Sequence, residues 1–222
     1  MNKYTHLNLH SEYSIQDGLI RINDLAEKAS DLNFESLAIT DLSNLFGFIK
    51  FYKELRKKGI KPICGSDFLL LGENTNSGNL QLLVKNHKGY KNLIRLISKS
   101  HTTGKINGNP FLSVKDLEEY SEGLLLITGG IDSQIGQSIL AGKNDIALKQ
   151  IKYLKNLYKD NFFLQLTRTG KNQEELCNQS LIEFANELSI PVVATNQVRF
   201  LSKEDFEAHE TRVCIQSGHV LG

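Results

Sequence analysis

The clearest candidates for metal chemistry lie near the N-terminus, in HLNLHSEYSIQDG (residues 6–18). Alternate residues of an extended strand point the same way, so His6, Asn8 and His10 would share one face. A His-x-His pair at the end of a strand is a common beginning of a metal site, because neutral imidazoles are good ligands for zinc and similar ions. Here asparagine stands where one imidazole would be expected. The segment therefore raises the question whether this is a metal enzyme or the remains of one.

The composition is that of an ordinary globular protein. The chain has 222 residues, of which 40% are hydrophobic and 23% charged, enough for one α/β barrel or two small domains. Its net charge of +1, from 26 basic and 25 acidic residues, provides no overall attraction to DNA or to anionic lipid. We find no apolar run near the roughly 20 residues of a membrane span, and no signal-peptide core in the first ten residues.

The three cysteines predict a reducing compartment. Cys64, Cys177 and Cys214 are odd in number, far apart and without a CxxC pair, which is typical of reduced thiols in a cytoplasmic protein. The chain also stops just after a helix-like stretch, and we expect it to be one domain of a longer protein.

Apolar runs alternate with amphipathic stretches along the chain, which predicts strands joined by helices. Strands are expected at 4–9, 36–41, 61–71, 80–85, 123–128, 162–167 and 191–196. Helices are expected near 22–32, 44–58, 88–103, 113–120, 132–140, 144–159, 172–188 and 203–216. This order favours parallel pairing, and seven strands favour a barrel over an open sheet. Chemistry in such barrels lies at the carboxyl ends of the strands, which here carry His10, Asp41, Asp67, Lys85, Thr128, Arg168 and Asn196.

Nucleotide-binding and hydrolase motifs give no alternative site. The sequence contains no GxGxxG, no GxxxxGK[ST] and no GxSxG. The glycines of GENTNSGN (72–79) indicate a hairpin-type turn between two strands, without a following helix that could hold a phosphate.

Six segments, in order and at the right spacing, resemble a known family. They are HLNLHSEYSIQDGL, LAITDLSNLFGFIKFY, GIKPICGSDF, KNHKGYKNLIRLISKS, EGLLLITGG and PVVATNQVRFL. They are similar to the N-terminal PHP (polymerase and histidinol phosphatase) domain of bacterial DNA polymerase III alpha subunits. The resemblance covers the whole chain and implies a distorted (β/α)7 TIM-like barrel. It also implies a single domain, residues 1–222, that is a fragment of a longer polymerase chain.

Active members of this family bind up to three divalent metals, and the resemblance lets each ligand position be compared. Asn8-Leu9-His10 stands at the His-x-His motif, so one ligand is lost and one kept. Asp17 is retained. The Thr-Asp-His motif is Thr40-Asp41-Leu42, and Asp67 stands at a family glutamate.

The later ligand positions depart further from the family pattern. Asn79 and Thr169 align with histidines, and Gly130 aligns with a cysteine. The final Asn-Asp-x-His motif has become residues 196–199, which end in Arg199. A glycine offers no side-chain ligand, and a guanidinium is a permanent cation that cannot be deprotonated. We therefore expect no catalytic residues and no bound metal, and only a degenerate metal cleft.

The expected cleft contains His10, Asp17, Asp41, Asp67, Arg168 and Arg199. Carboxylates left without metal would repel one another, and a guanidinium can bridge two of them. We hypothesise that Arg199, together with Arg168, replaces the metal charge and ties Asp17, Asp41 or Asp67 into a structural network.

Simpler interpretations compete with several of these assignments. His10 could be a buried, hydrogen-bonded imidazole, and Asp17 and Asp41 could be helix N-caps. Cys64 is expected to be a small core residue, and His209 with Glu210 to form a surface or interdomain contact.

Two basic segments favour solvated helix faces over DNA contacts. Residues 50–61 contain six cations, and four more recur along 88–99 at helical spacing. Either segment could contact DNA phosphates, but few aromatic residues lie between the cations, so base stacking is not indicated.

The resemblance implies a scaffold and docking function in DNA replication. The expected partners are the polymerase body of the parent chain, the proofreading exonuclease subunit, and DNA through the parent holoenzyme, with no membrane partner. The parent would be a DNA-directed DNA polymerase that uses magnesium in its own polymerase domain; this fragment alone is expected to need no cofactor and to be inactive. Two alternatives remain: a residual metal-dependent phosphoesterase, pyrophosphatase or 3′–5′ exonuclease, and a DNA-binding module that uses the basic helices.

Overall fold

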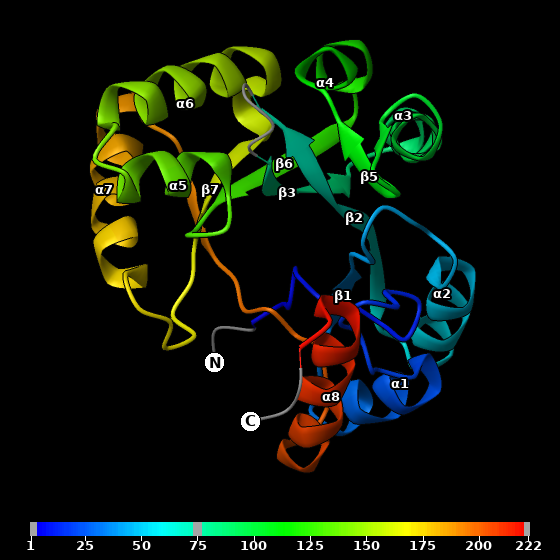
Figure 1. Cartoon of the computed structure of the whole chain (residues 1–222). Helices are drawn as coiled ribbons and strands as arrows, with labels where there is room; N and C mark the ends of the chain where they lie inside the picture. The colour runs from blue at the N-terminus through cyan, green and yellow to red at the C-terminus, as the bar shows by residue number, and fades with distance from the viewer. Residues whose placement is uncertain (1–3, 73–76, 220–222) are drawn as a thin grey trace. The chain divides into compact units, whose positions relative to one another are not determined.

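A computed structural model describes residues 4–72 and 77–219, and the chain divides into two compact units. The first unit contains Met1–Ser66 and Gln197–Gly222, so it is built from both ends of the chain. The second unit is the continuous segment Asp67–Asn196. Strand β2 (Lys61–Leu71) begins in the first unit and ends in the second. Figure 1 shows the elements of both units.

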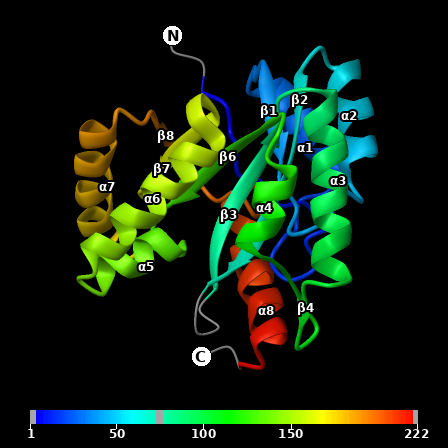
Figure 2. The ribbon, with the colours of Figure 1, turned by 90° about the horizontal axis from the view of Figure 1, so that it is seen from above.

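The first unit combines a short parallel strand pair with helices. Its elements are α1 (Ile22–Asp31), β1 (Ser36–Ile39), α2 (Phe48–Lys57), the start of β2, the 3-10 turn η3 (Lys203–Asp205) and α8 (Phe206–Ser217). β1 pairs in parallel with β2, from Ser36 opposite Lys61 to Ile39 opposite Cys64. Helices α1 and α2 pack against each other (Figures 1 and 2).

Apolar spacing explains why these helices form and how they pack. In α1 the buried residues are Ile22, Leu25, Ala26 and Ala29, which recur at three- and four-residue steps along one face. In α2 the fully buried residues Phe51 and Leu55 are four apart. Together with Leu9, Ile20, Leu37, Ile39 and Ile60 they form one hydrophobic cluster that holds the unit together.

The prediction of a regular strand at 4–9 is wrong. This segment is extended, but within the described residues its only bridge is an isolated one, between Leu9 and Val198. The N–H of Leu9 donates to the hydroxyl of Thr40 at 3.1 Å instead of to a backbone carbonyl, and this interrupts the ladder. The N–H of His10 still donates to the carbonyl of Val198, so the segment is fixed in place.

The second unit contains most of the strands. Its elements are β3 (Ser77–Val84), α3 (His87–His101), β4 (Lys105–Ile106), β5 (Asn109–Leu112), α4 (Val114–Tyr120), β6 (Leu124–Gly129), α5 (Gln134–Leu140), α6 (Asn144–Tyr158), η2 (Lys159–Asn161), β7 (Phe162–Leu166), α7 (Glu174–Leu188) and β8 (Val192–Ala194). The strands run in the order β4-β5-β2-β3-β6-β7-β8. Figure 2 shows α3 and α4 lying together, and α5, α6 and α7 forming a second group.

The parallel pairing that the alternation of strands and helices favoured does not extend to β3. β6, β7 and β8 pair in parallel as predicted, but β3 pairs antiparallel with β6, with Gln81 opposite Ile127. β3 follows β2 after a short connection, so it runs back along the sheet. The turn predicted within 72–79 lies mostly at 73–76, outside the described residues.

A short hairpin, β4 with β5, was not predicted. Its turn is Asn107-Gly108, with both φ angles positive, at 50° and 87°. This pair of residues suits a type I′ hairpin turn, because asparagine and glycine accept positive φ most readily.

The α/β class is confirmed, since parallel strands alternate with helices through both units. Closure of the strands into a barrel would join the two units, and it stays a prediction. No helix among the described residues is long and apolar enough to cross a membrane.

Candidate functional site

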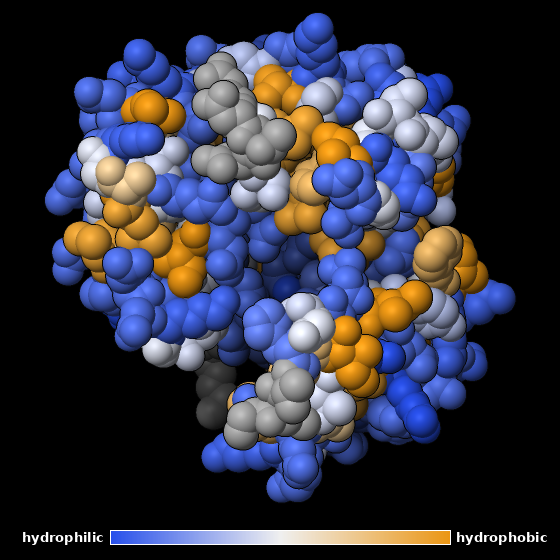
Figure 3. Space-filling view, in the orientation of Figure 1, coloured by the Kyte–Doolittle hydropathy of each residue, from blue (hydrophilic) through white to orange (hydrophobic). Residues whose placement is uncertain are grey.

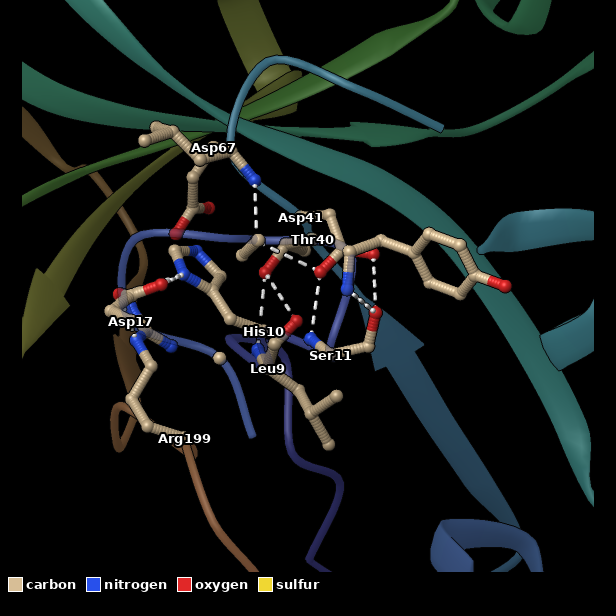
Figure 4. Close-up of polar contacts among 12 residues, drawn as sticks. Leu9, His10, Ser11, Asp17, Thr40, Asp41, Asp67 and Arg199 are labelled. Atoms are coloured by element: carbon tan, nitrogen blue, oxygen red, sulfur yellow. Dashed lines mark hydrogen bonds and ion pairs between the residues drawn. The ribbon is translucent and has the colours of Figure 1, made fainter. Parts of the chain in front are cut away.

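Asp17, in the first unit, is held between an imidazole and a guanidinium. Nδ1 of His10 lies 2.7 Å from Oδ1 and 2.9 Å from Oδ2 of Asp17. Nε of Arg199 donates to Oδ2 of Asp17 at 2.7 Å. A second guanidinium nitrogen of Arg199 donates to the side-chain oxygen of Asn8 at 2.8 Å and to the carbonyl of Val198 at 3.2 Å. Figure 4 shows Asp17 close to both His10 and Arg199.

The two partners favour the ionised form of Asp17. Partial burial by itself would raise the pKa of this carboxyl group. The hydrogen bonds and charges of His10 and Arg199 outweigh burial and hold the pKa of Asp17 below its usual range. Arg199 is mostly buried, with 12% of its side chain exposed, so its charge is poorly screened by solvent. The predicted ion pair between Arg199 and one of the carboxylates is therefore confirmed, and its partner is Asp17.

Asp41 forms a separate buried network with two serines. Its Oδ1 accepts from the N–H of Ser11 at 2.7 Å and from the hydroxyl of Ser14 at 2.9 Å. Its Oδ2 accepts from the hydroxyl of Ser11 at 2.8 Å. The hydroxyl of Ser14 also accepts from the N–H of Leu42 at 2.9 Å. Burial raises the pKa of Asp41 despite these hydrogen bonds. The residues of this network brace two loops, at 11–14 and at 41–42, against each other.

The structure decides between the alternative interpretations of these residues. The N-cap of α1 is Arg21 and the N-cap of α2 is Gly47, so the suggestion that Asp17 and Asp41 are helix N-caps is wrong. His10 is 3% exposed and hydrogen-bonded, as the simpler interpretation expected. Ser11 and Ser14 were missed, although a serine pair three residues apart beside an aspartate-bearing loop is a recognisable source of hydroxyl donors.

Asp67 and Arg168 belong to the second unit and have partners there. Asp67 is buried, and its Oδ1 accepts from the amide of Gln81 at 3.0 Å. Arg168 is 77% exposed and makes a bidentate pair with Glu175, at 3.1 Å for both bonds. The prediction that Arg168 acts together with Arg199 to replace the metal charge is therefore wrong. The guanidinium of Arg168 instead forms a solvent-exposed ion pair with Glu175, which lies on the first turn of α7.

The other positions aligned with metal ligands serve local structure in the second unit. Gly130 has a φ of 68°, in the left-handed region that favours glycine. The backbone N–H and the hydroxyl of Thr169 both donate to Glu174 at 2.7 Å, which closes the turn before α7. Burial would raise the pKa of Glu174, but these hydrogen bonds lower it below its usual range.

The remaining candidates also have structural explanations. Cys64 is buried in β2, and burial raises the pKa of its thiol to about 12, as expected for an unreactive core cysteine. His209 is half-buried, and its ring lies 5.3 Å from that of Phe200. On α3, Lys88 pairs with Glu122, and Lys99 pairs with acidic groups of α4. Those cations are thus partly neutralised within the protein.

The side chains that the structure describes do not form a group that could hold a metal ion. Among residues 4–72 and 77–219, no cluster of three or more His, Cys, Asp or Glu side chains is arranged to hold a metal ion. Both carboxylate oxygens of Asp17 are within hydrogen-bonding distance of protein groups, since Oδ1 lies close to His10 and Oδ2 lies close to Arg199.

Comparison with known proteins identifies the family of this chain. The family model of the PHP domain matches residues 6–169, and the chain belongs to this family. Among its relatives are the DNA polymerase III subunit alpha of Vibrio cholerae, 38% identical over 221 residues, and that of Escherichia coli K12, 40% identical over 223 residues. Each match covers 99% of this chain and 19% of the relative, so the chain spans about a fifth of the length of these proteins.

Solved structures support the fold alone. A Bifidobacterium adolescentis structure that is named as a metal-dependent phosphoesterase matches all of this chain and 98% of its own, with a TM-score of 0.62 and 11% identity. An amidohydrolase from Chromobacterium violaceum matches 94% of this chain and 96% of its own, with a TM-score of 0.56 and 11% identity.

Proposed function

We propose that this chain is a catalytically degenerate PHP domain of a DNA polymerase III alpha subunit, and that it serves in the cytoplasm as a scaffold and docking site for the proofreading exonuclease subunit. The family membership and the identity to alpha subunits support its place in a replicative polymerase. In this proposal magnesium and nucleotidyl transfer belong to the rest of the polymerase chain, and this domain reaches DNA only through the assembled enzyme.

The observation that carries the degenerate assignment is the contact of Arg199 with Asp17. A divalent ion bound by Asp17 would lie close to the guanidinium. At a separation of about 4 Å and an effective dielectric constant of about 20, the repulsion between the two would be about 8 kcal/mol. A cluster of ligands large enough to offset that repulsion is missing from the described residues. Since Arg199 cannot lose its proton, no ordinary pH removes this repulsion.

The same contact supports a structural role for the site. Asp17 lies in a loop near the N-terminus of the chain, and Arg199 lies near the C-terminal end of the same unit, 182 residues later. The ion pair therefore joins the two segments from which the first unit is built, a role that metal ions could otherwise fill. A domain stabilised in this way can keep its fold and its binding surfaces without any hydrolytic activity.

A residual metal-dependent phosphoesterase is the second candidate. Three ligand-type side chains of the first unit, His10, Asp17 and Asp41, favour it, and so does the likeness to the fold of a phosphoesterase. Against it, both Asp17 and Asp41 use their two oxygens for protein hydrogen bonds.

Copurification with the exonuclease subunit of the same organism tests the docking role. We expect the chain and the exonuclease to elute as one complex in size-exclusion chromatography. Separate elution at every mixing ratio would contradict the docking role. Phosphatase turnover with added Mn²⁺ or Zn²⁺, lost in His10→Ala, would instead establish the second candidate.

A further inference from the structure

We infer that the loops beside helix α2 form a docking surface for an acidic peptide segment with apolar anchors, supplied by a separate partner protein. The surface consists of Ile15, Phe46, Ile49 and Tyr52, together with Lys50, Lys53 and Arg56, and is called here the α2 surface. All seven side chains are exposed and belong to the first unit.

The apolar part of the α2 surface is unusually open to solvent. Ile15 and Phe46 are each 75% exposed, Ile49 is 56% exposed, and Tyr52 is 47% exposed. Single exposed apolar residues are ordinary, but a group of large ones on neighbouring elements indicates an interaction site. Figure 3 shows hydrophobic side chains gathered over the loops beside α2.

A buried polar frame fixes the two loops that carry Ile15 and Phe46. The amide of Asn44 donates to the carbonyl of Tyr13 at 3.2 Å, and its side-chain oxygen accepts from the N–H of Phe46 at 3.1 Å. Asn44 is buried, so these bonds are shielded from water. The Asp41 network described above braces the same loops through Ser11 and Ser14. Because the backbone is held on both sides, Ile15 and Phe46 are presented in a fixed geometry, and binding need not pay to order them.

The charge of the α2 surface identifies the chemistry of the partner. Ile49, Lys53 and Arg56 recur at helical spacing, so apolar and basic groups share one face of α2. Two neighbouring cations are already neutralised, since Lys57 pairs with Glu54 and Lys58 with Glu27. A peptide whose apolar side chains pack on Phe46 and its neighbours, and whose adjacent Asp or Glu residues contact the basic side chains, would complement both parts of the surface.

The α2 surface deepens the docking role proposed above and rests on it. Its test uses a phage library of random peptides, selected on the intact 222-residue chain, followed by binding titrations of the best synthetic peptide. We expect enrichment of Asp and Glu together with Leu, Ile or Phe. Phe46→Ser and Lys53→Glu should each raise the dissociation constant, Phe46→Ser by about thirtyfold, and added salt should weaken binding.

Ile215→Ser is the matched control, because Ile215 is 78% exposed but lies on α8, outside the α2 surface. Its dissociation constant should equal that of the parent chain. Peptides without acidic enrichment, or binding that Phe46→Ser leaves unchanged, would overturn the inference. Preferential binding of single-stranded DNA or of phosphatidylserine vesicles, lost in the same variants, would also overturn it and assign the surface to that ligand.

Thiol labelling in the whole polymerase separates a partner from the polymerase's own chain. With Lys53→Cys, and with the labelled residue identified by peptide mass spectrometry, we expect rapid maleimide labelling at position 53 of the polymerase alone and slow labelling there after the selected peptide is added at saturating concentration. Slow labelling of the polymerase alone would overturn the inference, because its own chain would then cover the surface. If the chain does not copurify with the exonuclease but still binds the selected peptide, the exonuclease role is refuted and the inference about the α2 surface is not.

Discussion

Arg199→Ala is expected to destabilise the first unit strongly, because it removes the cation that compensates a half-buried carboxylate. The substitution deletes the 2.7 Å bond to Asp17 and the 2.8 Å bond to Asn8. Removal of one partner of a buried ion pair costs about 3–5 kcal/mol. Asp17 is 28% exposed and keeps His10, so we expect a smaller loss, of about 2–3 kcal/mol. For a chain of this size that loss corresponds to a melting temperature lower by about 5–10 °C.

The dependence of this loss on pH tests its cause. The pKa of Asp17 in the folded state lies below its usual range, so the folded state binds the proton more weakly than the unfolded state. The stability from the ion pair is therefore fully present above the ordinary carboxyl pKa. It is lost as the pH falls through the lowered pKa of the folded state. The difference in unfolding free energy between the parent chain and Arg199→Ala should accordingly shrink in acid.

Arg168→Ala provides the matched comparison in urea and thermal unfolding. It also removes an arginine from a carboxylate, but that pair is largely exposed, and its loss should cost less than about 1 kcal/mol. Equal effects of the two substitutions, or a loss in Arg199→Ala that does not change with pH, would refute the reasoning.

Three further predictions follow from buried groups. Asp41→Ala leaves three buried donors without their acceptor and should lower the free energy of unfolding by about 2–4 kcal/mol in urea titrations. Gly89→Ala should destabilise the protein by more than about 3 kcal/mol in the same titrations, because its new methyl group would lie 1.8 Å from the carbonyl oxygen of Gly123. Under native conditions a thiol reagent should label Cys214, which is partly exposed, and leave the buried Cys64, with a pKa of about 12, unmodified.

Each of these has a result that would contradict it. Unchanged urea midpoints in Asp41→Ala would mean that the serines find other partners at no cost. Gly142→Ala is the comparison for Gly89→Ala: Gly142 has open space around it but a φ of 70°, so its substitution should cost only the backbone strain, about 1–2 kcal/mol, and equal losses would rule out the steric cause. Labelling of Cys64 as fast as Cys214 would show that β2 opens readily to solvent.

The helices and most strands could be predicted because their apolar spacing is determined by burial. The helix expected at 144–159 is α6, Asn144–Tyr158, and the strand expected at 61–71 is β2. The segment at 4–9 looked like a strand by the same criterion. It is not a regular strand because the N–H of Leu9 donates to the hydroxyl of Thr40, a tertiary contact that cannot be read from a local sequence pattern.

Strand direction and short hairpins were harder to predict than strand position. The alternation of strands and helices favoured parallel pairing in general. The hairpin-type turn predicted at 72–79 was the one signal that β3 turns back after β2, and its antiparallel pairing with β6 was not predicted. The Asn107-Gly108 turn carried a hairpin signal. It was missed because the strands it joins, of two and four residues, are too short to show alternation.

At the site, residue types could be predicted but pairings could not. The sequence placed a permanent cation, Arg199, where a ligand was expected, and the chemistry of arginine made a carboxylate partner a reasonable expectation. Which of three aspartates it contacts depends on how loops 182 residues apart meet. Arg168 showed the same residue type without the same role, because a nearer carboxylate, Glu175, is available to it.

Metal retention is the most direct test of the central claim that a guanidinium has replaced the metal charge. The chain is purified without chelator, equilibrated with Zn²⁺ or Mn²⁺, desalted and subjected to elemental analysis. We expect no stoichiometric metal in the parent chain. Retention of two or three ions per chain, abolished by His10→Ala, would contradict that claim.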